Sequence, residues 1–167
     1  YGTRAAEIAA ELAVHFEQGR NLGLALRYLQ QAAEKDLRRL APHEAIGLLT
    51  RGLALLDALP DTSERTQHEL ALQITLGSAL IAVKGYTAPE VEQAYTRARV
   101  LCRMVGETPQ LFSALCGLWT FYYLQAELQT AYELAEQLLA IARKANDSTW
   151  LVEAHQTLGT TLVGFGR

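Results

Sequence analysis

Histidine side chains are the first groups in this sequence that could do chemistry, as metal ligands or as proton carriers. The four of them are His15, His43, His68 and His155. None has a second metal-type ligand three or four residues further on in a recognised pattern, and a metal site needs several convergent ligands. His43-Glu44 also lacks the second histidine of a zinc-protease motif. We therefore expect no metal and no cofactor, with the histidines on or near helix surfaces.

The sequence also lacks the patterns of nucleophilic and phosphate chemistry. Cys102 and Cys116 fall in different predicted helices, with no His or Lys evidently placed to activate either thiol. Free cysteines of this kind usually pack as small hydrophobic residues. Neither a Gly-x-Ser-x-Gly elbow nor a Gly-x-x-x-x-Gly-Lys phosphate loop occurs. We expect the segment itself to be non-catalytic.

Composition narrows the class of protein further. The 167 residues are half hydrophobic and carry a net charge of −3, which disfavours disorder and a nucleic-acid-binding surface. Apolar runs stop short of the roughly 20 residues of a membrane span, and Glu7 and Glu11 stand where a signal peptide would be apolar. Two cysteines make no disulfide framework. These features predict one domain, residues 1–167, in the cytoplasm, with no nucleic acid or membrane as partner.

Helical periodicity runs through the whole chain and predicts an all-α fold. Pro42 and Pro109 mark first turns of helices, Thr108 is placed as an N-cap, and Gly19 is a candidate left-handed residue after a helix. Asp61, three residues before Glu64, resembles a capping box. The sequence predicts about eight antiparallel helices joined by short links, at 4–18, 22–40, 43–58, 64–84, 89–105, 109–125, 128–145 and 149–164.

An internal repeat organises these helices. Large and small residues recur at steps of 42 and 40 residues, and their partner helices share alanines at matching positions. Small residues let helices approach closely, and large ones fill the space opposite. The first such helices carry Ala9, Leu12, Ala13, Phe16, Ala25, Leu29 and Ala32. The later ones carry Leu76, Gly77, Leu80, Leu118, Trp119, Tyr122, Ala131, Ala135, Leu138, Leu158, Gly159 and Leu162.

This pattern resembles the tetratricopeptide repeat, a family that folds as a right-handed α-α superhelix. Trp119 stands where the family has a small residue, and the period is nearer 40 residues than the family's usual 34. The longer period is similar to the helical arrays at the C-terminal side of large bacterial signalling ATPases, as are YLQQAAEK at 28–35, EAIGLLTRGL at 44–53 and GETPQL at 106–111. That resemblance implies a fragment of a larger protein, fused in some members to cyclase, kinase or transcription-factor domains.

The resemblance also implies a binding groove, because in tetratricopeptide arrays the first helix of each hairpin lines the concave face. Carried onto this sequence, the nearly uncharged groove is Ala10, Val14, Ile74, Ser78, Cys116, Thr120, Tyr123, Gln156 and Thr160. It lacks the Lys and Asn with which some members clamp a peptide carboxylate. The neighbouring aromatic residues Trp119, Phe121, Tyr122 and Tyr123 could either fill the core or line the groove.

Two functions remain open at this point. The first is a protein-interaction scaffold that binds a protein, a peptide or another domain of the same chain. The second is a small-molecule sensor that binds a ligand near Trp119 and Tyr123 and signals to an attached ATPase module. The last repeat lacks its second helix, so Leu158, Leu162 and Val163 should form an exposed apolar patch that could support a homodimer.

Overall fold

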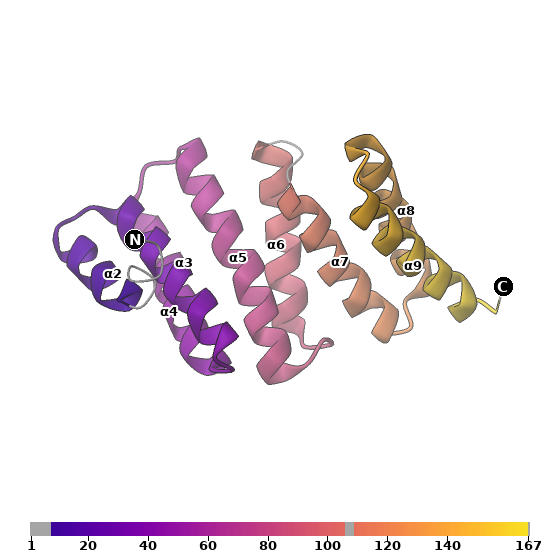
Figure 1. The fold of residues 1–167 in the computed structure, drawn as a ribbon, viewed down its shortest axis with the longest axis horizontal. Helices are drawn as coiled ribbons and strands as arrows, with labels where there is room; N and C mark the ends of the chain where they lie inside the picture. Colours follow the sequence, from indigo (N-terminus) through magenta and orange to yellow (C-terminus); the bar gives the residue numbers. More distant parts are fainter. Residues whose placement is uncertain (1–7, 106–108, 167) are drawn as a thin grey trace.

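The computed structural model describes residues 8–105 and 109–166, and within them every regular element is a helix (Figure 1). The order is α2 (Ala9–Gln18), α3 (Leu22–Arg38), α4 (Pro42–Leu55), a short 3-10 helix (Leu56–Ala58), α5 (Ser63–Lys84), α6 (Pro89–Val105), α7 (Pro109–Leu124), α8 (Leu128–Ala145) and α9 (Ser148–Gly164). The predicted all-α class is confirmed. The expected helix start near residue 4 and the break at Gly106 and Thr108 lie outside the described residues.

Four of the links between helices close in the same way. Arg20, Leu40, Ala126 and Asn146 each have a positive φ, between 52° and 60°, one or two residues after a helix ends. The next amide reaches back to a carbonyl five residues earlier, at 2.8 Å for the first link. This is the hydrogen bond of a Schellman closure. The prediction that Gly19 takes the left-handed conformation was wrong, since its φ is −74° and the following residue turns the chain.

The start of α5 also differs from its prediction. Thr62, and not Asp61, is the N-cap, and its side chain accepts a hydrogen bond from the Arg65 amide at 3.2 Å. Arg65 itself reaches back, donating to the Leu56 carbonyl at 3.0 Å and lying 3.5 Å from the Asp61 carboxylate. Asp61 therefore holds a side chain of the first turn instead of capping the helix.

The helices form two layers. Each helix packs against the next in sequence, and in addition α3 contacts α5 and α5 contacts α7. On the other side, Arg99 of α6 donates to Gln137 of α8 at 2.9 Å. In Figure 1, α7 passes in front of α6 and α9 in front of α8, while α2 and α9 lie at opposite ends. The helix beside α5 is α3, so α2, which carries Ala10 and Val14 of the predicted groove, does not lie in the row of α5 and α7.

Most residues of the repeat pattern contribute to the core. Eleven of them are buried: Ala9, Ala13, Ala25, Leu29, Ala32, Gly77, Leu80, Leu118, Ala131, Ala135 and Leu138. Leu12, Phe16, Leu76, Trp119 and Tyr122 are half-buried. The alanines have no bulk to keep helices apart, so neighbouring helices meet along them.

Helix α9 departs from the predicted register. Its buried residues are Ala154, Thr157 and Thr161, whereas Gly159 is exposed and has open space where a Cβ would stand. Leu158 and Leu162 are half-buried, and Val163 is 72% exposed. Of the three residues expected to form an apolar patch at this end, only Val163 is largely exposed.

Candidate binding site between α5, α7 and α9

A tyrosine from α6 passes between two helices of the other layer. Tyr95 is only 5% exposed, and its ring lies against Gly77 of α5 and Gly117 of α7. A Cβ added at these glycines would stand 2.6 Å and 2.5 Å from ring carbons, which is closer than real Cβ contacts allow. The two glycines therefore form a window through which the ring crosses the layer.

The hydroxyl end of Tyr95 emerges on the far side of this window. It lies 3.3 Å from the Ser78 hydroxyl, and burial raises the pKa of the phenol. Because the ring is enclosed and its polar end has a partner, Tyr95 fixes the spacing of α5 and α7 at this point. The position of the hydroxyl defines the floor of a pocket.

The pocket has a volume of about 360 Å³ and lies across α5, α7 and α9. It has hydroxyl groups, aromatic rings and one carboxylate on its walls. The lining comprises Ser78, Ile81, Tyr86, Tyr95, Phe112, Ser113, Cys116, Gly117, Thr120, Trp150 and Glu153. The α7 and α9 walls meet where Phe112 and Trp150 stack, with ring centroids 4.7 Å apart and planes at 9°.

Glu153 is the one charged side chain among the described residues that line this pocket. Its Oε1 accepts a hydrogen bond from the Cys116 thiol at 3.5 Å. Burial raises the pKa of that thiol, and the Glu153 charge and its hydrogen bond raise it further. Helix α7 carries no charged residue from Pro109 to Leu124. Glu153 therefore places a single negative charge beside the uncharged helix α7.

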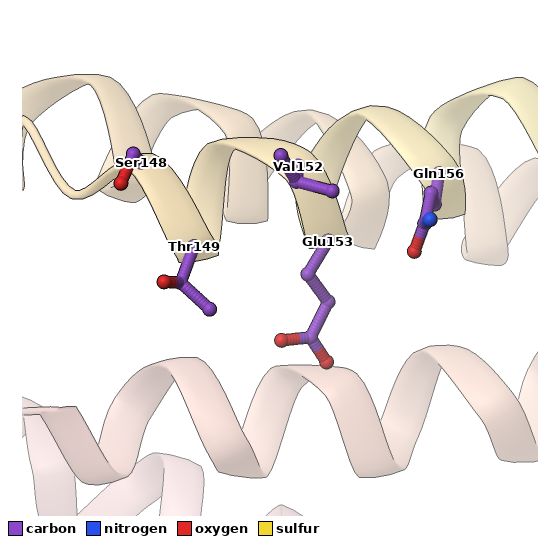
Figure 2. A pocket seen from close by; sticks show the side chains of 5 residues that line it. All are labelled: Ser148, Thr149, Val152, Glu153 and Gln156. Atoms are coloured by element: carbon purple, nitrogen blue, oxygen red, sulfur yellow. The ribbon is translucent and has the colours of Figure 1, made fainter.

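The groove residues predicted from the sequence divide between several places. Ser78, Cys116 and Thr120 do line the pocket. Gln156 borders a shallower hollow of about 530 Å³ beside it, with Ser148, Thr149, Val152 and Glu153 (Figure 2). Figure 2 shows the Glu153 and Thr149 side chains extending from α9 toward the neighbouring helix. The two hollows share Glu153, which is the one acidic residue lining either of them among the described residues.

The other predicted groove residues lie apart from the pocket. Ala10 and Val14 are on α2, which packs against α3. Ile74 is half-buried against the core, and Thr160 is exposed further along α9. These placements follow from the layer assignment, because α2 does not stand in the row of α5 and α7.

The aromatic cluster of α7 makes several contacts between helices. Trp119 donates from Nε1 to Thr161 Oγ1 of α9 at 2.9 Å, and Tyr123 stacks on Trp119 at 5.3 Å. Tyr122 donates to Glu92 of α6, and this hydrogen bond raises its pKa to about 12. Phe121 is buried at 6% exposure. Tyr123 is half-buried, and its assignment to the open face stays a prediction.

Sequence reasoning missed Tyr86, Tyr95, Trp150 and Glu153. One signal could have pointed to Tyr95. Two glycines 40 residues apart, in the middle of strong helices, are costly unless a close approach needs them. No such signal marks Glu153, because a single carboxylate on a helix reads as an ordinary solvated residue.

The described residues contain no group of three or more His, Cys, Asp or Glu side chains that could hold a metal ion. Among the helices of residues 8–105 and 109–166, none combines the length and apolarity needed to cross a bilayer. No protein-family model matches the chain, and neither does any curated protein.

The Cys116 thiol should react slowly with iodoacetamide near pH 8, and Glu153→Gln should speed the reaction. The thiolate is the nucleophile, and a raised pKa keeps it scarce. Removing the Glu153 charge lowers that pKa, and one unit corresponds to about tenfold more thiolate. The rates should be measured in a Cys102→Ala background, with Glu133→Gln on α8 as the control. Equal rates for wild type and Glu153→Gln would show that the carboxylate does not act on the thiol.

Proposed function

We propose that this chain is a non-catalytic interaction module whose partner binds across α5, α7 and α9. The observation that carries the proposal is the pocket itself. It gathers four aromatic residues, three hydroxyl side chains and one carboxylate on a helix face that is otherwise nearly uncharged. Aromatic residues beside a few placed polar groups are typical of surfaces that bind proteins or ligands.

The resemblance to tetratricopeptide arrays supports the same proposal. Two layers of helices, buried alanines where helices meet and a shared closure at four of the links are features expected of a right-handed superhelix of such hairpins. In that arrangement α5, α7 and α9 would line the inner face. By analogy the module would hold, or report to, the other domains of a signalling ATPase.

The acidic pocket argues against one partner class of that family. A clamp for a peptide's C-terminal carboxylate needs cationic or amide donors, whereas Glu153 would repel such a group. The partner we propose is therefore a protein segment or a neighbouring domain bound through apolar, aromatic and hydrogen-bonding contacts, and not through its carboxyl terminus.

A small-molecule sensor is the second candidate, and the size of the pocket favours it. A volume of about 360 Å³ is at the lower end of the range for small ligands. The ligand would lie at Cys116 and Trp150. It would not lie near Trp119 and Tyr123, because those two rings stack on each other. A metabolite that binds there would raise the melting temperature by linkage.

Ser113→Arg in the full-length protein should abolish co-purification of the partner. Ser113 is exposed at the pocket edge, so the new side chain should block the face without disturbing the core. Ala140→Arg, on the exposed side of α8, is the matched control and should leave the partner bound. Melting curves should show both variants folded. If Ser113→Arg retained the partner and Ala140→Arg lost it, the binding face would lie on the layer that contains α8, and the proposal would be wrong.

A further inference from the structure

The charge of the pocket indicates what kind of group it holds. Glu153 contributes a negative charge, and none of the described residues around it contributes a compensating positive one. The neighbouring Cys116 thiol donates a hydrogen bond to the same carboxylate at 3.5 Å. Glu153 would repel an anionic ligand, and a neutral ligand would gain no charge–charge attraction from it.

The aromatic residues of the pocket also favour a cationic ligand. Tyr86 and Trp150 border the same space as the carboxylate, and Tyr86 is 50% exposed, so it is accessible from solvent. Aromatic faces attract ammonium and guanidinium groups, by about 0.5–1 kcal/mol at exposed sites and more when water is excluded. Carboxylate and aromatic rings together are the usual surroundings of a bound organic cation.

Hydroxyl groups supply the remaining requirement. The N–H groups of a cation need acceptors in addition to the carboxylate, and hydroxyl oxygens can accept. Ser78, Ser113 and Thr120 bring three of them to the pocket from α5 and α7. Thr120 already donates its own proton to the Cys116 carbonyl at 2.9 Å, which leaves its oxygen lone pairs for a guest.

We infer that the pocket between α5, α7 and α9 binds an organic cation, an alkylammonium or guanidinium group, with Glu153 as its counter-ion. Two sources share this chemistry, a free amine or guanidine and a Lys or Arg side chain of the bound partner. The inference rests on the proposed function, because both use the same face of the protein. An experiment can nevertheless disprove either one without disproving the other. A chain without a protein partner could still bind the cation, and a chain that binds no cation could still carry the partner.

Titration of the 167-residue chain with n-butylammonium and with ethylguanidinium, followed by ¹H–¹⁵N NMR, tests this. We expect saturable shifts at the Trp150 indole and the Ser113 and Cys116 amides, while the Trp119 indole serves as an internal reference. The dissociation constant should be of millimolar order for ligands of this size. Ethylurea and butyrate, neutral and anionic analogues, should bind at least about tenfold more weakly, since the charge supplies much of the affinity.

Variants identify the counter-ion. Glu153→Gln should weaken butylammonium binding about tenfold or more, and Tyr86→Ala, at an exposed position, should weaken it several-fold. Glu44→Gln, an exposed carboxylate on α4, should change nothing. Equal binding of ethylurea and ethylguanidinium, or an unchanged affinity in Glu153→Gln, would overturn the inference.

Blocked amino acids distinguish the sources. If N-acetyl-lysine or N-acetyl-arginine methylamide binds more tightly than butylammonium, the pocket is shaped for a partner's side chain. If the blocked residues are excluded while butylammonium still binds, it is shaped for a free amine or guanidine. If neither butylammonium nor the blocked residues bind, the inference fails and only the partner contact remains.

Discussion

Gly117→Ala and Gly77→Ala should each lower the free energy of unfolding by about 1–3 kcal/mol, the usual cost of overpacking a filled core. In both variants the new methyl group would stand within 2.9 Å of three carbons of the Tyr95 ring. The ring cannot move aside easily, because it lies between two helices at 5% exposure. The loss should exceed the roughly 0.5–1 kcal/mol that alanine gains over glycine within a helix. Urea unfolding of the two variants measures the difference.

Two other glycines provide matched controls of opposite sign. Gly47 on α4 and Gly159 on α9 are also inside helices, but nothing lies within 4 Å of a Cβ built on them. Gly47→Ala and Gly159→Ala should therefore raise the free energy of unfolding by about 0.5–1 kcal/mol. In a Tyr95→Ala background the cost of Gly117→Ala should disappear. A stabilised Gly117→Ala variant would mean that the Tyr95 ring does not occupy the window.

Arg97→Met should be the second strongly destabilising change, lowering the free energy of unfolding by about 2–3 kcal/mol. Arg97 of α6 donates to both carboxylate oxygens of Glu69 on α5, from Nε at 2.5 Å and from Nη2 at 2.9 Å. Glu69 is only 8% exposed, so losing its partner leaves a charge in a largely dry place. The side chain of Arg97 is 46% exposed, which keeps the cost below the 3–5 kcal/mol of a fully buried pair.

The double variant and a surface pair separate this effect from lost packing. Arg97→Met with Glu69→Met removes both charges and should recover most of the stability, because no unpaired charge remains. Lys84→Met breaks the exposed pair of Lys84 with Glu90 and should change the free energy of unfolding by less than about 1 kcal/mol. Equal losses for Arg97→Met and Lys84→Met in urea unfolding would show that Glu69 is not desolvated.

The positions of the helices could be predicted from the sequence, because local signals determine them. Pro42, Pro89 and Pro109 begin helices where their missing amide costs nothing, and each prediction agrees with the structure within a few residues. It is harder to predict which of two adjacent residues will cap a helix. Asp61 and Thr62 are both good N-caps, and the structure uses Thr62 while Asp61 lies near the Arg65 side chain.

The candidate site was only partly predictable, because its parts come from separate helices. Ser78, Cys116 and Thr120, three residues of the predicted groove, line the pocket, and helical phase puts them on one side of α5 and α7. Phase alone cannot say which helices share a layer, so α2 was placed with α5 in error. Nor can it show that Tyr95 reaches through the other layer, because that depends on the spacing of α5 and α7 across the fold.

The proposed binding face is tested most directly by photo-crosslinking in the full-length protein. A photoreactive phenylalanine, p-benzoylphenylalanine, would replace Ser113 at the pocket edge or, as the control, Ala140 on the exposed side of α8. We predict a specific protein adduct from position 113 and none from position 140. Adducts at position 140 with none at position 113 would contradict the assignment of α5, α7 and α9 as the face that receives the partner.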